Sequence, residues 1–252
     1  MRTWRNWQTR SPQEAVAARS WRFKSSRPHH LMSMQRSKFS SFLQLLRLPN
    51  LFTAVADPLA GWLLTGGRGT LLLPVATSAS LYTAGIVLND CFDYRLDCRE
   101  RPERPLPRGD IPVSIAWTLG AVLFLTGLAL GGVKALPLAA LIIFYNAVAK
   151  NSVWLAPVTL GACRAGNFAL GMGGFAPLWP PVILGIYVAG LTLIARREVV
   201  KPALRRVVKQ MLLGIIVVDA GFVMTTGDWL GAMLVFSLLL PAMVLAKMIP
   251  MT

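Results

Sequence analysis

Histidine and cysteine are scarce in this chain of 252 residues, and their scarcity excludes several kinds of active site. Both histidines, His29 and His30, lie near the N-terminus, so the rest of the chain holds no histidine-dependent triad and no histidine-ligated haem. The cysteines Cys91, Cys98 and Cys163 have neither the spacing of a metal site nor that of a disulfide framework. We expect Cys91 and Cys98 to be free thiols.

Acidic residues are few as well, since 11 Asp and Glu stand against 26 Lys and Arg and give a net charge of +15. Such an excess suggests nucleic-acid binding when it is spread over a soluble surface. Most of the basic residues instead gather in three clusters, within 1–47, 95–108 and 196–209, which are separated by apolar runs. We therefore interpret the charge as a signal of membrane topology and expect no nucleic-acid partner.

Long apolar runs make up most of the remaining sequence, which is 54% hydrophobic overall. Runs of about 17–25 apolar residues are long enough to cross a bilayer as helices. The sequence therefore predicts an all-α, polytopic membrane bundle of about eight transmembrane helices in two four-helix halves. The predicted spans are 41–65, 70–90, 112–131, 133–149, 152–176, 180–196, 210–226 and 229–249.

The distribution of charge between these spans predicts their orientation. With eight spans, the three basic clusters and Lys150 fall on one side of the bilayer, and Arg68 and Lys134 fall on the other. The positive-inside rule assigns the clustered side to the cytoplasm, so both termini are expected there.

Three aspartates follow the second apolar run at helical offsets 0, 3 and 7, namely Asp90, Asp93 and Asp97. At about 100° per residue their side chains share one helix face, where like charges repel unless cations lie between them. Mg²⁺ binds one or two carboxylates and leaves room for phosphate oxygens. The stripe indicates a site for a metal-chelated diphosphate, and a solvated acidic turn is the alternative.

Residues 1–31 are rich in Arg, Trp and Ser and have no sustained apolar periodicity, so we expect a disordered extension outside the fold. One explanation is an organelle transit peptide. The explanation we favour is translation of an upstream segment that is not part of the gene, with the true start at Met32 or Met34.

The motif Asn89-Asp90-x-x-Asp93-x-x-x-Asp97, followed by Arg101-Pro-x-Arg104-Pro-Leu-Pro-x-Gly109, resembles the first aspartate-rich motif of the UbiA superfamily of intramembrane prenyltransferases. The resemblance covers about residues 40–250. Two further stretches resemble the branch named EboC, which occurs in bacterial secondary-metabolite clusters. They are Tyr145-Asn146-x-x-x-Lys150 and Gly161-x-Cys163-Arg164-x-Gly166-Asn167.

This resemblance implies a helical bundle in the bacterial inner membrane, with a cavity open to lipid. Its prenyl diphosphate is held through Mg²⁺, and the prenyl group passes to a lipophilic acceptor, aromatic or other. Asp90, Asp93 and Asp97 are then catalytic residues and metal ligands. The expected substrate-binding residues are Asn50, Asn89, Arg101, Arg104, Lys150, Arg164, Asn167, Arg196, Arg197, Glu198 and Lys201.

The chain departs from the family pattern at the second aspartate motif, where Leu191 replaces the first acid and Glu198 stands at the second acidic position. Leucine cannot bind a metal, which leaves Glu198 as the one expected metal ligand of this half. Arg196, Arg197 and Lys201 could neutralise phosphate instead. The alternative is a non-catalytic protein that binds or translocates a polyprenyl or prenylated metabolite.

Charged residues inside the predicted spans are costly and are functional or paired in most membrane proteins. Asp57 is expected either to pair with Arg164 or to act in catalysis. Asp219 is expected to form a contact between helices. Asn50 and Asn167 are candidates for contact with the allylic region or a diphosphate oxygen.

Overall fold

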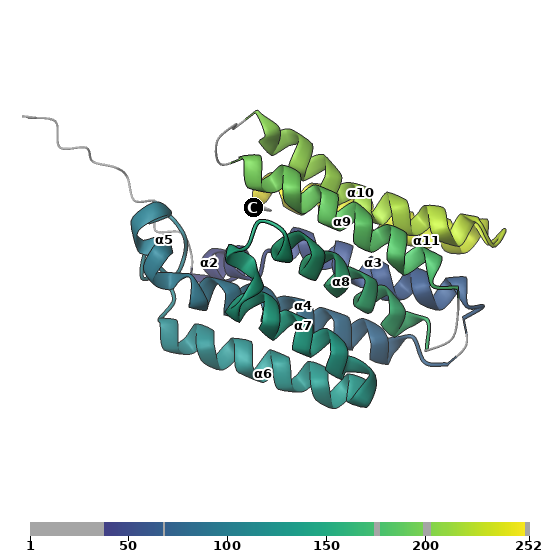
Figure 1. Ribbon diagram of the computed structural model, residues 1–252, viewed down its shortest axis with the longest axis horizontal. Coiled ribbons are helices and arrows are strands. Elements are labelled where there is room, and N and C mark those ends of the chain that lie inside the picture. Colours follow the sequence, from purple (N-terminus) through teal and green to yellow (C-terminus); the bar gives the residue numbers. More distant parts are fainter. Residues whose placement is uncertain (1–37, 68, 174–176, 199–202, 250–252) are drawn as a thin grey trace, which may run out of the picture. The chain divides into compact units, whose positions relative to one another are not determined.

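The computed structural model describes residues 38–67, 69–173, 177–198 and 203–249, and every regular element within these ranges is a helix (Figure 1). The expected all-α class is therefore confirmed. Residues 1–31 and Lys201 lie outside the described residues. The α-helices are α2 (Lys38–Leu45), α3 (Leu48–Leu64), α4 (Leu72–Phe92), α5 (Tyr94–Glu100), α6 (Val113–Gly131), α7 (Leu136–Ala147), α8 (Leu155–Gly171), α9 (Trp179–Glu198), α10 (Leu204–Met224), α11 (Trp229–Ser237) and α12 (Leu239–Met248).

The first predicted span, 41–65, is divided into α2 and α3 instead of forming one helix. The division lies at Arg47, whose left-handed backbone (φ 45°, ψ 51°) cannot continue a right-handed helix. Pro49 follows in the first turn of α3, where its missing N–H costs no helical hydrogen bond. The break matters for the site because it directs the Arg47 guanidinium towards Asp90, at the end of α4.

The other predicted spans each correspond to helices of the structure. The last span, 229–249, consists of α11 and α12, and the short 3₁₀ turn Gly132–Ala135 joins α6 to α7. Helices α3 and α8 have 17 residues each and carry buried polar side chains. In the described part of the chain, five stretches are long and apolar enough to cross a membrane: Leu72–Phe92, Val113–Ala147, Trp179–Arg197, Leu204–Met224 and Trp229–Met248.

Helix packing brings α3 and α8 unusually close together. A Cβ atom on Gly171 of α8 would lie 1.9 Å from the carbonyl oxygen of Pro58, and one on Gly61 would lie 2.4 Å from that of Phe168. Glycine at such crossings lets the helix backbones touch, as in many membrane proteins. This contact positions Asp57 of α3 against Arg164 of α8.

The bundle places apolar side chains both inside and outside. Helices α9 and α10 lie side by side with α8 next to α9, whereas α4 packs against α6 on the other side of α8 (Figure 1). Phe168, Ile215, Ile216 and Val223 belong to the largest buried cluster. Large apolar side chains on α6, α7, α11 and α12 remain exposed, which is the expected surface of helices that face lipid.

Candidate functional site

Asp90 and Asp97 are brought together at the end of α4 and in α5. Both are buried, with 5% and 4% of their surface exposed. Arg104, in the loop after α5, spans the two carboxylates: its Nη1 atom lies 2.7 Å from Asp97 Oδ2 and 3.3 Å from Asp90 Oδ1. Arg47 contributes a second guanidinium, with Nη2 at 2.9 Å from Asp90 Oδ1. Asp90 and Asp97 therefore lie close together, but on two helices, because α4 ends at Phe92 and α5 begins at Tyr94, so the three aspartates do not share the face of one helix as predicted. Arginines balance the charge of Asp90 and Asp97.

Asp93 lies between them in the sequence but has a different partner. It is the residue at which α4 ends and α5 begins, and its carboxylate forms an ion pair with Lys150. The Lys150 ammonium also lies over the Phe92 ring, 5.5 Å from its centre. The ion pair joins the segment after α7 to the end of α4, so the predicted substrate ligand Lys150 does lie beside the first motif.

The acidic residues fit a small magnesium site better than a three-carboxylate cage. Among the described residues, no three His, Cys, Asp or Glu side chains lie close enough together to hold a metal ion. Asp90 and Asp97 nevertheless share a single guanidinium, so one cation can reach both. One or two carboxylates completed by water and phosphate oxygens form a usual Mg²⁺ site. The side chain of the fourth predicted ligand, Glu198, lies outside the described part of the chain.

Burial raises the pKa of the Asp97 carboxyl, and the neighbouring Arg104 acts in the opposite direction. In the same loop, the hydrogen bond to Asp110 raises the pKa of Arg108. Asp110 also accepts a hydrogen bond from Ser41 of α2. This contact, which the sequence did not predict, connects the arginine-rich loop to α2.

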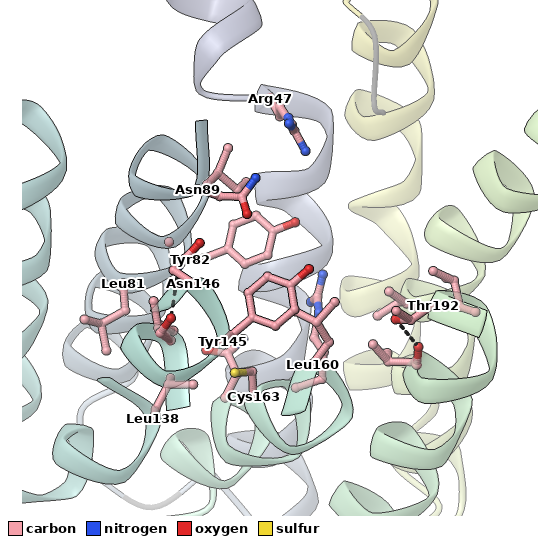
Figure 2. Close-up of a pocket in the computed structure, with 18 of the residues that line it drawn as sticks. Arg47, Leu81, Tyr82, Asn89, Leu138, Tyr145, Asn146, Leu160, Cys163 and Thr192 are labelled. Carbon is pink, nitrogen blue, oxygen red and sulfur yellow. Dashed lines mark hydrogen bonds between the residues drawn. The ribbon is translucent and has the colours of Figure 1, made fainter. Parts of the chain in front are cut away.

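A cavity of about 260 Å³ lies among α4, α7, α8, α9 and α10 (Figure 2). It is next to Asp90, because Arg47, which pairs with Asp90, lines it. The rings of Tyr82 and Tyr145 lie within it, below Asn89 in the view of Figure 2. Among the described residues, two arginines and no acidic residue line it. Its lining residues are Arg47, Leu81, Tyr82, Gly85, Ile86, Asn89, Leu138, Ile142, Tyr145, Asn146, Leu160, Cys163, Arg164, Asn167, Val188, Leu191, Thr192, Leu212 and Ile215.

Arg164 is a buried charged residue of the helical core. Its Nη1 atom donates to Asp57 Oδ2 at 2.9 Å, so the predicted ion pair is confirmed. It also donates to the carbonyl and hydroxyl oxygens of Thr53, and its guanidinium lies 5.1 Å from the centre of the Tyr82 ring. Asp219 of α10 is fully buried, but neither of its carboxylate oxygens has a hydrogen-bond partner among the described residues, so the expected contact between helices stays a prediction.

Asn50 and Asn167 are both buried, but Asn167 has no free amide hydrogen. Its Nδ2 atom donates to the carbonyl oxygen of Ala54 and to Asp57 Oδ2. A contact between the Asn167 amide and a diphosphate oxygen would therefore require an existing hydrogen bond to break. The side-chain carbonyl oxygen of Asn167 is buried and has no hydrogen-bond partner among the described residues.

Among the described residues that line the cavity, neither Arg196 nor Arg197 of α9 is found. Arg196 Nη1 donates to the carbonyl oxygens of Lys150 and Ser152 at 3.2 and 2.9 Å, so it fixes a loop to α9. Arg197 is exposed, and Lys201 is outside the described residues. Leu191, at the position of the missing acid, is buried and lines the cavity.

Other polar residues of the predicted motifs differ in whether they line the cavity. The predicted ligand Asn89 lines the cavity, whereas Arg101 is exposed at the end of α5. Asn146 lines the cavity too, yet it was not predicted as a site residue. The quoted motif around Tyr145 contained it, but a single polar residue in an apolar run does not reveal which side it faces.

Comparison with known proteins identifies the family. The sequence pattern of the UbiA prenyltransferase family matches residues 51–196. Digeranylgeranylglyceryl phosphate synthase of Methanoculleus marisnigri is 32% identical over 177 residues, which cover 65% of this chain and 62% of that enzyme. The enzyme of the same name from Methanothermobacter thermautotrophicus is 29% identical over 168 residues, covering 64% of this chain and 59% of the relative. The chain thus matches about three fifths of the length of these relatives.

Solved structures agree on the fold. A structure from a study of digeranylgeranylglyceryl phosphate synthase in membranes superimposes with a TM-score of 0.56 at 19% identity and covers 82% of this chain and 94% of its own. A UbiA homologue from Archaeoglobus fulgidus, bound to GPP and Mg²⁺, has a TM-score of 0.54 at 15% identity, with coverage of 82% and 87%. The apolar helices and the family match together make this an integral membrane protein. The chain belongs to the UbiA prenyltransferase family.

Proposed function

We propose that this protein transfers a prenyl group from a prenyl diphosphate to a lipophilic acceptor inside the membrane, with Mg²⁺ as cofactor. The observation that carries the proposal is the position of Asp90, Asp93 and Asp97, each paired with a basic side chain, beside a cavity with mainly apolar walls. The Mg²⁺ and GPP or DMAPP bound to the homologue of Archaeoglobus fulgidus support the choice of cofactor and donor.

In this proposal the carboxylates of Asp90 and Asp97 would hold the ion. When bound, Mg²⁺ would neutralise the diphosphate and make it a better leaving group. Arg104 and Lys150 would exchange their carboxylate partners for phosphate oxygens, since both already lie at the aspartates. The apolar walls around Leu138 would exclude water from the reacting carbon.

The identities of the prenyl donor and of the acceptor form a second part of the proposal. The names of the curated relatives support a geranylgeranyl donor and a glyceryl phosphate lipid as the first pair to test. The resemblance to the EboC branch, by contrast, supports an acceptor from secondary metabolism. We further propose a location in the bacterial inner membrane with both termini in the cytoplasm, on the basis of the basic clusters.

The direct test is Mg²⁺-dependent release of pyrophosphate by the purified chain in lipid nanodiscs, with DMAPP, GPP and geranylgeranyl diphosphate as donors. A lipid extract would supply acceptors, and mass spectrometry would identify the product. Release that needs both Mg²⁺ and acceptor supports the proposal. Tight binding of every donor without any release would instead support a carrier, the second candidate, which the buried Leu191 in place of an acid favours.

A further inference from the structure

The two ends of the cavity differ in their distance from the aspartates. Arg47 and Asn89 lie at one end, and Leu138 and Cys163 lie at the other (Figure 2). The first end is next to the aspartates, because Arg47 pairs with Asp90. A prenyl chain whose diphosphate lies at the aspartates would therefore extend towards Leu138 and Cys163.

Close packing of apolar side chains closes this far end. Leu81 of α4 and Leu138 of α7 are 0% and 5% exposed and belong to one buried cluster with Ala135 and Ala139. Helix α6 lies directly behind Leu81, since a Cβ atom on Gly127 would lie 2.6 Å from Leu81 Cγ. Protein interiors packed in this way leave few voids larger than a water molecule. The cavity therefore ends at the two leucines.

Hydrogen bonds close the cavity towards α3. Arg164 and Asn167 both line it. The Arg164 guanidinium donates to two oxygens of Thr53 and to Asp57, and the Asn167 amide donates to the carbonyl oxygen of Ala54 and to Asp57. A prenyl chain that passed between α8 and α3 would break these bonds and leave buried polar groups without partners. An apolar chain is therefore excluded on this side as well.

The depth of the cavity follows from the helices that run along it. From Asn89 to Leu81 on α4, and from Asn146 to Leu138 on α7, eight residues at about 1.5 Å each give a depth of about 12 Å. A carbon–carbon bond of about 1.5 Å advances an extended chain by about 1.2 Å, so an isoprene unit with four main-chain carbons spans about 5 Å. The depth thus accommodates about two isoprene units.

The volume of the cavity gives the same length. An engineered apolar cavity of about 150 Å³ binds one benzene molecule, which corresponds to about 25 Å³ for each carbon. At that ratio the cavity of about 260 Å³ holds about ten carbons, the number in a geranyl chain. The geranylgeranyl group in the names of the curated relatives has twice as many carbons.

We propose that the prenyl donor of this protein is no longer than geranyl diphosphate, and that Leu138 sets this limit. The inference rests on the proposed function and specifies its donor, in contrast to the geranylgeranyl donor that the names of the relatives support. Leu138 is then a specificity-determining residue, because it contacts the end of the chain farthest from the diphosphate.

The test measures how tightly donors of increasing length bind to the full chain in lipid nanodiscs. Dissociation constants of radiolabelled DMAPP, GPP, farnesyl diphosphate and geranylgeranyl diphosphate are determined with and without Mg²⁺, and empty nanodiscs give the partition of each donor into lipid. The variants are Leu138→Ala, which enlarges the far end, and Cys163→Leu, which fills it. Leu184→Ala is the matched control, because Leu184 of α9 is 0% exposed and is not among the lining residues.

We expect the wild type to bind GPP at least about tenfold more tightly than the two longer donors, since one methylene in an apolar pocket already changes selectivity by about 10–200-fold. Leu138→Ala should lower the preference for GPP over farnesyl diphosphate by at least about threefold, and Cys163→Leu should shift the preference from GPP towards DMAPP by a similar factor. Leu184→Ala should keep the wild-type ratios.

Wild-type binding of geranylgeranyl diphosphate as tight as that of GPP would overturn the length limit, because the tail would then leave the cavity between helices. Unchanged ratios in Leu138→Ala would overturn the assignment to Leu138. If that variant does not fold, unchanged ratios in Cys163→Leu would overturn the assignment to this end of the cavity. Mg²⁺-dependent binding of all four donors with equal affinity refutes the length limit alone, whereas the absence of Mg²⁺-dependent binding of any donor contradicts the proposed function as well.

Discussion

Arg164 and Asp57 form a buried ion pair, 107 residues apart in the sequence, with an N–O distance of 2.9 Å. The pair connects α8 to α3, and its side chains are 8% and 0% exposed. Such a pair contributes little when it is compared with apolar residues of equal volume, but removal of one partner leaves a buried charge without compensation. The arrangement makes Asp57 a sensitive position for stability and connects the cavity wall to the helical core.

Asp57→Ala should lower the free energy of unfolding by about 3–5 kcal/mol, because it leaves the Arg164 charge buried. Asp228→Ala is the matched control: Asp228 caps α11 through a hydrogen bond from Gly231, and its loss should cost about 1 kcal/mol. Thermal unfolding in one detergent measures both variants. Equal losses would contradict an ion pair that contributes to the core.

Gly171→Ala should disrupt the contact between α8 and α3, since the new Cβ atom would lie 1.9 Å from the Pro58 carbonyl oxygen. We expect a loss of at least about 1–3 kcal/mol from overpacking. Gly221→Ala is the control, because a Cβ atom on Gly221 meets nothing within 4 Å and alanine favours helix. The argument for close backbone contact fails if the two variants unfold at the same temperature.

The local part of the site could be predicted from the sequence, and the contacts between distant segments could not. Helical offsets predicted that Asp90 and Asp97 lie close together, and the structure joins them through Arg104, although on two helices. The same periodicity gave no reason to expect the left-handed Arg47, which splits the first span. Composition favours a helix there, whereas the break depends on a backbone conformation that few non-glycine residues adopt.

The sequence also could not predict which acceptor each basic side chain contacts. The sequence offered Arg196 as a phosphate ligand because it lies in the degenerate motif, but its guanidinium binds two backbone carbonyls. Basic residues near a site have several acceptors within reach, and only the packing of α9 against the loop before α8 decides among them. For Asp57 the sequence left two roles open, and the ion pair with Arg164 is one of them.

Asp93→Ala should reduce Mg²⁺-dependent binding of GPP at least tenfold while the protein remains folded. Asp93 lies between Asp90 and Asp97, and its loss also removes one of three neighbouring negative charges. Glu100→Ala removes the same charge from an exposed acid on α5 that is not one of the three aspartates, and it should bind GPP normally. Isothermal titration with GPP and Mg²⁺ measures both. Unchanged affinity in Asp93→Ala would exclude Asp93 from the metal site proposed at Asp90 and Asp97.

The loops 95–108 and 196–209 should lie together on the cytoplasmic side. Single cysteines in a cysteine-free background, labelled in whole cells by an impermeant maleimide, test this orientation. The native Cys98 on α5 and an introduced Ala203→Cys should label after the cells are opened, whereas Thr70→Cys should label in intact cells. All three positions are in the described part of the chain, and all are exposed. Labelling of Ala203→Cys in intact cells, while Cys98 labels only after the cells are opened, would contradict the eight-span topology.

Leu191→Asp tests whether the second half of the site is weakened or absent. The leucine is buried on the cavity wall, seven residues before Glu198 and thus about two turns along α9. If the protein is an enzyme with a weakened second metal site, the new carboxylate should strengthen Mg²⁺ dependence and raise release of pyrophosphate. If it is a carrier, the aspartate has no ion to pair with and should destabilise the protein by roughly 2.5–3.5 kcal/mol.

Leu193→Asp is the control, because Leu193 is 37% exposed and its acid cannot reach the cavity. Thermal stability with and without Mg²⁺ and GPP separates the cases, since only an acid that joins the metal site is stabilised by the ligands. A Leu191→Asp variant that loses stability and gains nothing from them, like Leu193→Asp, would favour the carrier.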